Sequence, residues 1–445
     1  MRTSDRRLSF IGRFVLAICL LGLASSFAHA FTIQEVTSPG GLKAWLVEER
    51  AIPLITINFS FRPGNAEDPA GQEGVSEFLT GMMDEGAGAM LADEFQRKRE
   101  ALAFRMSFDS GADFFEGSFQ TLSHNRHESF DLLRMAITEP RFDPEPLERV
   151  RKQFLLNIKE DLQNPQSIAW QAWATKSLPN DPYARPSSGT EASMSAITAV
   201  DLHAAHRRIF NRNTLQVAVV GDITGAELGP LLDLIFGGVP EKWPDRKVLP
   251  PARAEMGPAV TVIDRDMPQS VIVFGHEGLL RSDPDFIPAY VMSEILGGGG
   301  LTSRLAQELR EKRGLTYGVS FGLSPMQRVG LYAGVLQTKN ESAGEALEAA
   351  KSVIARYAAE GPTQVELDEA KTYLIGSYPL RFSSNAAIAG QLLALQQQEL
   401  GVDYVKKRNS LVEAVTLEQV REQARRLLHP DRMIVSVVGR PKAIK

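Results

Sequence analysis

The sequence predicts an α+β protein of two homologous domains, each a mixed β-sheet with packed helices. The first observation is an internal repeat, because residues 196–222 align without gaps on residues 414–440. The copies share an alanine, a threonine, a pair of arginines, three valines and a glycine, which indicates duplication. Each copy is typical of a helix, a short turn and a buried strand. The second observation is size, since 445 residues with 43% hydrophobic content are enough for two ordinary domains.

The domain boundary is predicted between the two copies of the repeat. Residues 238–257 are rich in proline, glycine and charge, which favours a linker. This linker separates an N-terminal domain at residues 31–237 from a C-terminal domain at residues 258–445.

Residues 1–30 are typical of a cleavable signal peptide. Arginines precede an apolar run from Phe14 to Leu23, and a small-residue cleavage site ends at Ala30. We expect a periplasmic protein exported by the general secretory route, although Arg6-Arg7 leaves twin-arginine export open. The only cysteine, Cys19, lies in the apolar run, so we expect neither a disulfide nor a lipid anchor in the mature chain.

The sequence indicates neither a membrane-spanning protein nor a nucleic-acid-binding protein. No later stretch reaches the ~18 apolar residues that span a bilayer, so we expect no membrane span in the mature chain. A net charge of −5 gives no indication of nucleic-acid binding.

Residues 74–83 have the apolar spacing of an amphipathic helix. Its other face carries Glu77, Thr80 and Gly81. Zinc peptidases of the inverted type need His, Glu and His at this spacing, two imidazoles for the metal and a carboxylate that activates water. Since this face has no imidazole, we expect no zinc here. From the helix alone, a surface helix with a polar side is the simpler interpretation.

The histidines outside the signal peptide offer no alternative zinc site. They are His124, His127, His203, His206, His276 and His429. Two pairs are spaced i, i+3, but none has a carboxylate pair or a third imidazole at ligand spacing. Glu77, Asp84 and Glu85 would hold a hard cation only weakly, and solvated acids are the simpler interpretation.

In the C-terminal domain, a helix followed by a strand is predicted. The buried face of the helix is marked by Leu301, Leu305 and Leu309. Gly314 ends the helix, and residues 315–321 alternate like a strand. Arg310 is expected at the end of this helix and Tyr317 at the start of the strand.

A run of four glycines precedes this helix. It consists of Gly297, Gly298, Gly299 and Gly300. Without side chains, the run allows close approach of another backbone, and without a following Gly-Lys-Ser/Thr it is no phosphate loop. A flexible connection between helices explains it equally well.

These features together resemble the pitrilysin/insulinase family of zinc peptidases. The resemblance is carried by the repeat and by the amphipathic helical spacing of residues 74–83. It is also carried by residues 180–186 with Gly189-Thr190, and by residues 303–305 and 309–315. It covers nearly all of residues 31–445. The chain is most similar to the bacterial and mitochondrial-processing type, in which each chain is half of a two-chain clamshell.

The resemblance places the family's zinc ligands on residues that cannot bind zinc. The His-x-x-Glu-His motif falls on Glu77, Thr80 and Gly81, and the remaining glutamate ligand falls on Asn157. A second glutamate that supports the site falls on Val150. Both helices persist without the metal chemistry, which implies a non-catalytic chain that needs no cofactor of its own.

The resemblance also implies a function for the C-terminal domain. In the family, residues at the positions of Arg310 and Tyr317 face the zinc across a cavity, hold the substrate backbone and stabilise the oxyanion. The run from Gly297 to Gly300 takes the place of the glycine-rich loop that the non-catalytic processing subunit uses on its substrate. We therefore expect a non-catalytic subunit of a heterodimeric zinc metallopeptidase that degrades or processes peptides, inactive alone and paired with a homologue bearing His-x-x-Glu-His and zinc.

Two alternatives remain. In the first, the chain is a catalytically inert structural or peptide-binding relative, in which Arg310 forms a surface ion pair and Tyr317 packs at a helix–strand corner. In the second, it is an independent peptidase that uses other zinc ligands.

Overall fold

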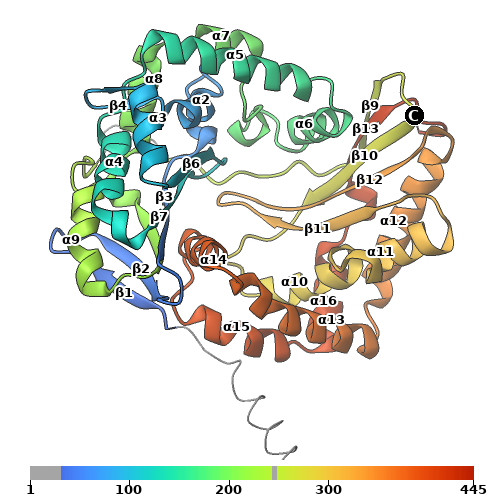
Figure 1. Ribbon diagram of the computed structural model, residues 1–445. Coiled ribbons are helices and arrows are strands. Elements are labelled where there is room, and N and C mark those ends of the chain that lie inside the picture. The colour runs from blue at the N-terminus through green and yellow to red at the C-terminus, as the bar shows by residue number, and fades with distance from the viewer. Residues whose placement is uncertain (1–31, 243–247, 445) are drawn as a thin grey trace, which may run out of the picture.

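Two mixed β-sheets, one from each half of the chain, form the framework of the protein (Figure 1). The computed structural model describes residues 32–242 and 248–444, so the expected signal peptide and part of the expected linker lie outside the described residues. Within these residues, no helix has the length and apolarity needed to cross a bilayer.

The first half has a six-stranded sheet in the order β1-β2-β8-β3-β7-β6. Its strands are β1 (Gln34–Thr37), β2 (Lys43–Glu48), β3 (Leu54–Phe61), β6 (Arg105–Ser110), β7 (Phe115–Leu122) and β8 (Gln216–Gly221). The β2–β8 pair is parallel and the other pairs are antiparallel. A separate hairpin joins β4 (Gly86–Ala87) to β5 (Met90–Leu91). The helices are α2 (Val75–Met82), α3 (Ala92–Ala101), α4 (Arg126–Thr138), α5 (Pro144–Asp161), α6 (Pro165–Ser177), α7 (Glu191–Ala196), α8 (Ala199–Ile209) and α9 (Gly225–Phe236).

The second half has a five-stranded sheet in the order β11-β12-β10-β13-β9. Its strands are β9 (Ala259–Asp264), β10 (Gln269–Glu277), β11 (Val319–Pro325), β12 (Gly330–Lys339) and β13 (Ile434–Gly439). The helices are α10 (Phe286–Ser293), α11 (Arg304–Ala306), α12 (Ala343–Glu360), α13 (Gln364–Ser377), α14 (Asn385–Gln397), α15 (Tyr404–Glu413) and α16 (Leu417–Leu427). Two π-helical segments, η5 (Glu294–Gly298) and η7 (Gln307–Lys312), flank α11.

The two halves share one topology. The path β2-β8-β3-β7-β6 matches β9-β13-β10-β12-β11, and β13 pairs with β9 in parallel as β8 does with β2. The repeat predicted from sequence falls on α8 with β8 and on α16 with β13. Thr198 and Thr416 each form a capping box at the start of their helix, which satisfies orphan backbone donors there. The predicted class, α+β with two homologous domains, is confirmed.

Each half also covers the sheet of the other with one helix. Helix α6 packs on β10 and β13 of the second sheet, and α14 packs on β3 and β8 of the first. The Trp173 indole N–H donates to the Ile434 carbonyl at 3.1 Å, and the Gln396 amide donates to the Val217 carbonyl at 3.0 Å. Figure 1 shows both helices in the middle of the molecule, between the sheets. The two halves therefore share hydrophobic cores.

Polar contacts join the halves near the β11–β12 turn. Arg328 binds the Asp181 carboxylate at 2.5 Å and lies over the Tyr183 ring. The Tyr183 hydroxyl in turn donates to Asp113, whose carboxylate also accepts from the Gln327 backbone N–H at 3.2 Å. Residues 180–186, singled out in the sequence, thus contribute to the junction between the halves.

Candidate functional site

Helix α2 carries three of the degenerate zinc-ligand positions. Gly74 precedes it with φ 89°, and a side chain at Gly74 would lie 2.6 Å from the Ser188 carbonyl oxygen, so a glycine is needed there. The face that packs on the core is fully buried. It consists of Val75, Phe78, Leu79 and Met82.

The other face of α2 has no metal-binding geometry. The Thr80 hydroxyl donates to the Glu77 carbonyl at 2.7 Å, within the helix. Burial, with a smaller contribution from the negative charges of Asp109 and Asp68, raises the pKa of Glu77 to about 7. In residues 32–242 and 248–444, no three His, Cys, Asp or Glu side chains come together as a metal site.

The space for a second imidazole is already filled. A Cβ atom on Gly81 would lie 2.8 Å from Phe154 and 2.9 Å from Val150, both on α5. Phe154 also packs on the Phe78 ring, with the ring centroids 5.8 Å apart. Asn157, one turn further along α5, is exposed, and its amide oxygen accepts from Gln153 at 2.9 Å. The residues present do not fit zinc, because imidazoles are absent and an apolar contact occupies their place.

Restoring the family's ligands is therefore expected to leave the chain without zinc. The variant carries Glu77→His, Thr80→Glu, Gly81→His and Asn157→Glu. An imidazole at position 81 must displace Phe154 and Val150, a cost of about 1–3 kcal/mol typical of overpacking. We expect less than stoichiometric zinc by metal analysis after dialysis against zinc, and more zinc when Phe154→Ala is added. One zinc per chain in the fourfold variant, with unchanged thermal stability, would contradict this.

The acids that follow α2 are engaged in ion pairs. Asp84 accepts from Arg99 at 2.7 Å, and Glu85 binds Arg149. These contacts make cation binding at Glu77, Asp84 and Glu85 less favourable.

The histidines are also explained without a metal. The His206 ring lies 2.7 Å from the Ile137 carbonyl and stacks on Phe210, and burial lowers its pKa to about 4. His276 is buried, with its pKa lowered to about 4 for the same reason. It lies beside His429, but no third ligand joins this pair among the described residues.

The N-terminal end of α2 is held by a buried ion pair. Asp68 is 3% exposed and accepts hydrogen bonds from the backbone N–H groups of Gly74 and Ser76 and from the Ser76 hydroxyl. The Arg208 guanidinium on α8 binds the same carboxylate at 2.6 Å and the Ser76 hydroxyl at 2.9 Å. Burial raises the pKa of Asp68, and the charge of Arg208 opposes that effect. The position of α2 thus depends on a charge pair remote from its degenerate face.

Arg310 and Tyr317 lie in the second half, on the connection into β11. Arg310 is inside η7, which continues to Lys312, and its side chain is 37% exposed with a 3.4 Å ion pair to Glu311. Tyr317 is 87% exposed and precedes β11, which begins only at Val319. The strand predicted from residue 315 was therefore placed too early. Thr316 fixes the turn, since its hydroxyl lies 2.7 Å from the Gln337 carbonyl.

The glycine run spans the end of one helical segment and the turn that follows it. Gly297 and Gly298 end the π-helical segment η5, and a side chain on Gly297 would lie 2.5 Å from the Phe321 carbonyl oxygen. Gly300 has φ 57° and open space around it. The run therefore combines a close backbone contact with a short exposed turn.

The structure also corrects the predicted start of the following helix. Leu301 is 55% exposed rather than buried, because residues 300–302 form a separate 3-10 turn and α11 begins at Arg304. Leu305 and Leu309 are buried as expected. π-helical segments such as η5 and η7 are rare and are frequent at functional sites.

The two candidate sites do not meet within this chain. Figure 1 shows α2 and α11 on opposite sides of the molecule. The helix with the degenerate ligand positions and the segment that follows α11 therefore belong to different halves of the chain.

A large apolar hollow lies at the junction of the halves. It has a volume of about 980 Å³ and runs along α6, with Trp170, Trp173 and Leu331 among its lining residues. No feature of the sequence indicated it, because its walls come from both halves.

The comparisons with known proteins agree with this geometry. The family profile described as Peptidase M16 inactive domain matches residues 196–374. The chain is 26% identical over 391 residues to the non-peptidase homolog YmxG of Helicobacter pylori, covering 85% of this chain and 87% of that protein. It is 25% identical over 415 residues to an uncharacterized zinc protease of Mycobacterium leprae, ML0855, covering 90% and 91% of the two chains.

A solved structure shows the same fold. The crystal structure of a peptidase M16 inactive domain from Pseudomonas fluorescens superposes with a TM-score of 0.86 at 29% identity, covering 93% of this chain and 99% of that one. Together with the family profile, the relatives and the lost ligands on α2, it shows that this chain is similar to inactive members of the M16, or pitrilysin, peptidase family.

Proposed function

We propose that this chain is the non-catalytic subunit of a two-chain zinc peptidase that acts on peptides in the periplasm. A homologue with an intact His-x-x-Glu-His motif is its partner and holds the zinc. The observation that carries the proposal is the exposure of Tyr317, which is 87% exposed and makes no hydrogen bond among the described residues, close in sequence to Arg310. A large exposed phenol at the turn before a strand is available to a second chain.

The chemistry of the pair suits peptide hydrolysis. Attack on a peptide carbonyl creates a negatively charged oxygen, and a phenol donor beside a cation stabilises that charge. The partner's zinc supplies the activated water. Arg310 holds the substrate backbone and Tyr317 donates to the oxyanion, while the open turn at Gly300 leaves room for the peptide.

The relatives support a family with both kinds of member. One is named a non-peptidase homolog, and another, covered to a similar share of its length, is named an uncharacterized zinc protease. A pair made of one chain of each kind retains the zinc site that this chain lacks.

The test is co-purification of the tagged mature chain from its native periplasm, followed by mass spectrometry. We expect a homologue with His-x-x-Glu-His in roughly one-to-one amount, and zinc and peptidase activity in the complex but not in this chain alone. An untagged chain and a tagged unrelated periplasmic protein serve as controls. Recovery of the chain without such a homologue would contradict the proposal.

The apolar hollow along α6 favours a second candidate, a peptide-binding relative without a catalytic partner. Its volume of about 980 Å³ and its aromatic walls suit apolar side chains of a peptide. Binding of peptides by the isolated chain, with no peptidase recovered, would support this candidate.

A further inference from the structure

The turn that carries Tyr317 is tied to β12 by a threonine hydroxyl. The Thr316 hydroxyl lies 2.7 Å from the Gln337 carbonyl on β12 and 2.7 Å from the Gly318 carbonyl. It also accepts a hydrogen bond from the Gly318 N–H at 3.1 Å, a local contact that is typical of a tight turn. Thr316 is 7% exposed, whereas Tyr317 is 87% exposed. The backbone beside Tyr317 is therefore held while its phenol extends into solvent.

The residues between Arg310 and this turn are held as well. The Thr338 hydroxyl, on β12, donates to the Leu315 carbonyl at 2.6 Å. The Leu315 N–H donates to the Leu309 carbonyl at 2.8 Å. The Gly314 N–H donates to the Arg310 carbonyl at 3.1 Å. These bonds fix the backbone of Arg310 relative to the turn before any substrate is bound.

The first half offers an internal comparison for Tyr317. The ladder registers of the two sheets make Met106 on β6 the counterpart of Val319 on β11. Phe104, two residues before Met106, is therefore the counterpart of Tyr317. Phe104 is 4% exposed, and its ring packs on the Phe119 ring with the centroids 5.1 Å apart. The aromatic side chain at this position is thus buried in the first half and exposed in the second.

The hydroxyl contacts beside this position also differ between the halves. Ala103 is the counterpart of Thr316 and has no hydroxyl. Thr121 is the counterpart of Thr338, but its hydroxyl donates to the Ser129 hydroxyl on α4 at 2.9 Å. The half that exposes its aromatic residue is therefore the half in which two threonines tie the neighbouring backbone to the sheet.

We propose that Thr316, assisted by Thr338, is a positioning residue that holds the Tyr317 phenol where the oxyanion forms in the two-chain peptidase. This inference rests on the proposed function, in which Tyr317 donates to that oxyanion. A phenol on a loose turn would lose conformational freedom each time it made this hydrogen bond. A turn fixed in advance avoids that cost at the moment of reaction, as preorganised donors do in general.

The first test is the effect of Thr316→Val on peptide cleavage by the reconstituted complex. Valine keeps the branched shape and removes the hydroxyl. We expect kcat to fall about 10-fold with KM nearly unchanged, since misplacing a catalytic group by about 1 Å can cost about 100-fold. Thr316→Ser keeps the hydroxyl and should retain the wild-type kcat.

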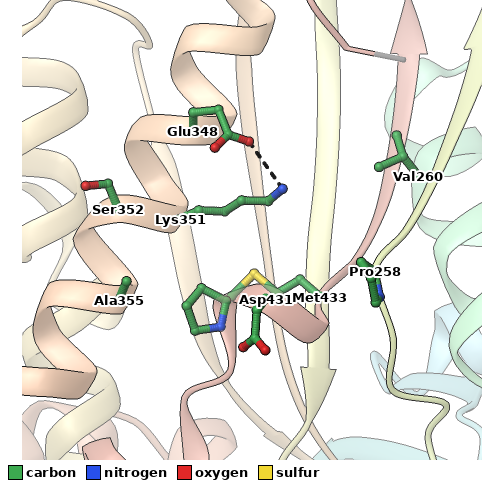
Figure 2. Close-up of a pocket in the computed structure, with 9 residues that line it drawn as sticks. Pro258, Val260, Glu348, Lys351, Ser352, Ala355, Asp431 and Met433 are labelled. Carbon is green, nitrogen blue, oxygen red and sulfur yellow. Dashed lines mark hydrogen bonds and ion pairs between the residues drawn. The ribbon is translucent and has the colours of Figure 1, made fainter.

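Ser352→Ala is the matched control, because it also removes a hydroxyl from the second half. Ser352 is exposed and lines a hollow of about 330 Å³ between β9 and α12 (Figure 2). Strand β9 is at the opposite edge of the sheet from β11, so this variant should keep the wild-type kcat.

A double-mutant cycle separates positioning from general structural damage. If Thr316 acts only through the phenol, Thr316→Val should cause no further loss of kcat in a Tyr317→Phe background. An equal loss with and without the phenol hydroxyl would overturn the inference and leave the proposed function intact. An unchanged kcat in Thr316→Val, when Tyr317→Phe lowers it, would overturn the inference as well. Full activity of Tyr317→Phe would instead overturn the proposed function, and the inference with it.

Hydrogen exchange in the isolated chain tests the hold on the turn without any peptidase. The Gly318 N–H donates to the Thr316 hydroxyl, so it should exchange more slowly than in an unstructured chain, and Thr316→Val should remove this protection. Thr338→Val is the second variant if Thr316→Val fails to fold, and it should lower kcat only when Tyr317 is present. A Gly318 N–H without protection in the wild-type chain would overturn the inference.

Discussion

Replacing Tyr317 by phenylalanine is expected to lower the kcat of the two-chain peptidase by about 100-fold, with KM nearly unchanged, because the loss of one oxyanion donor has effects of this size. The hydrogen bond from the phenol hydroxyl is strongest when negative charge develops on the substrate oxygen. Its removal therefore raises the free energy of the transition state more than that of the bound substrate. Tyr317 is 87% exposed, and its side chain makes no hydrogen bond to any residue that the structure describes, so stability and assembly should not change.

The measurement is steady-state cleavage of a fluorogenic peptide by the reconstituted complex. Tyr373→Phe is the matched control, because Tyr373 is a 60% exposed tyrosine on α13, and this variant should keep full activity. Arg310→Ala should raise KM as well as lower kcat, since Arg310 is proposed to hold the substrate backbone before reaction. Full activity in both Tyr317→Phe and Arg310→Ala would show that this chain donates neither group.

Local signals explain why much of the fold was predictable. The repeat matched α8 with α16 and β8 with β13, because a threonine cap, an apolar helix face and a run of valines are all encoded within about 25 residues. The frame of α2 was recognisable for the same reason. Its loss of metal chemistry also follows from the residues at positions 77, 80 and 81.

Features that depend on distant packing were not predictable. The sequence does not indicate that α6 and α14 each pack on the sheet of the other half. The sequence likewise gave no sign that Phe154 fills the space beside Gly81. The exposure of Leu301 was missed because a 3-10 turn interrupts the regular helical spacing assumed for that segment.

The structural difference between the two halves could also not be predicted from the sequence. The repeat predicts two similar domains, and it does not indicate that β1 and α9 cover only the first sheet. The exposure of Val260 and Val262 appears only when β9 is compared with β2 in three dimensions.

Arg208 provides the largest expected effect on stability. Its guanidinium is 6% exposed and faces an Asp68 carboxylate that is 1% exposed. Arg208→Met removes the cation and leaves a buried carboxylate without its charge partner. Breaking a buried ion pair in this way costs about 3–5 kcal/mol. We therefore expect the free energy of unfolding, measured in urea at pH 7, to fall by that amount.

The repeat supplies the matched control for this prediction. Arg426 is the counterpart of Arg208 in α16, and its guanidinium also pairs with acids that precede a helix, Asp285 at 3.1 Å and Asp283 at 4.0 Å. Because Arg426 is 44% exposed, Arg426→Met should cost less than about 1 kcal/mol.

The cause of the loss can be separated from simple packing by pH and by a second substitution. Without Arg208 the pKa of Asp68 rises further, so its carboxyl is protonated more readily and the destabilisation should be smaller at pH 5 than at pH 8. Adding Asp68→Asn to Arg208→Met removes the unpaired charge and should recover part of the stability, which a double-mutant cycle measures as coupling. Equal losses for Arg208→Met and Arg426→Met, with no coupling and no pH dependence, would show that the buried charge pair does not hold α2 in place.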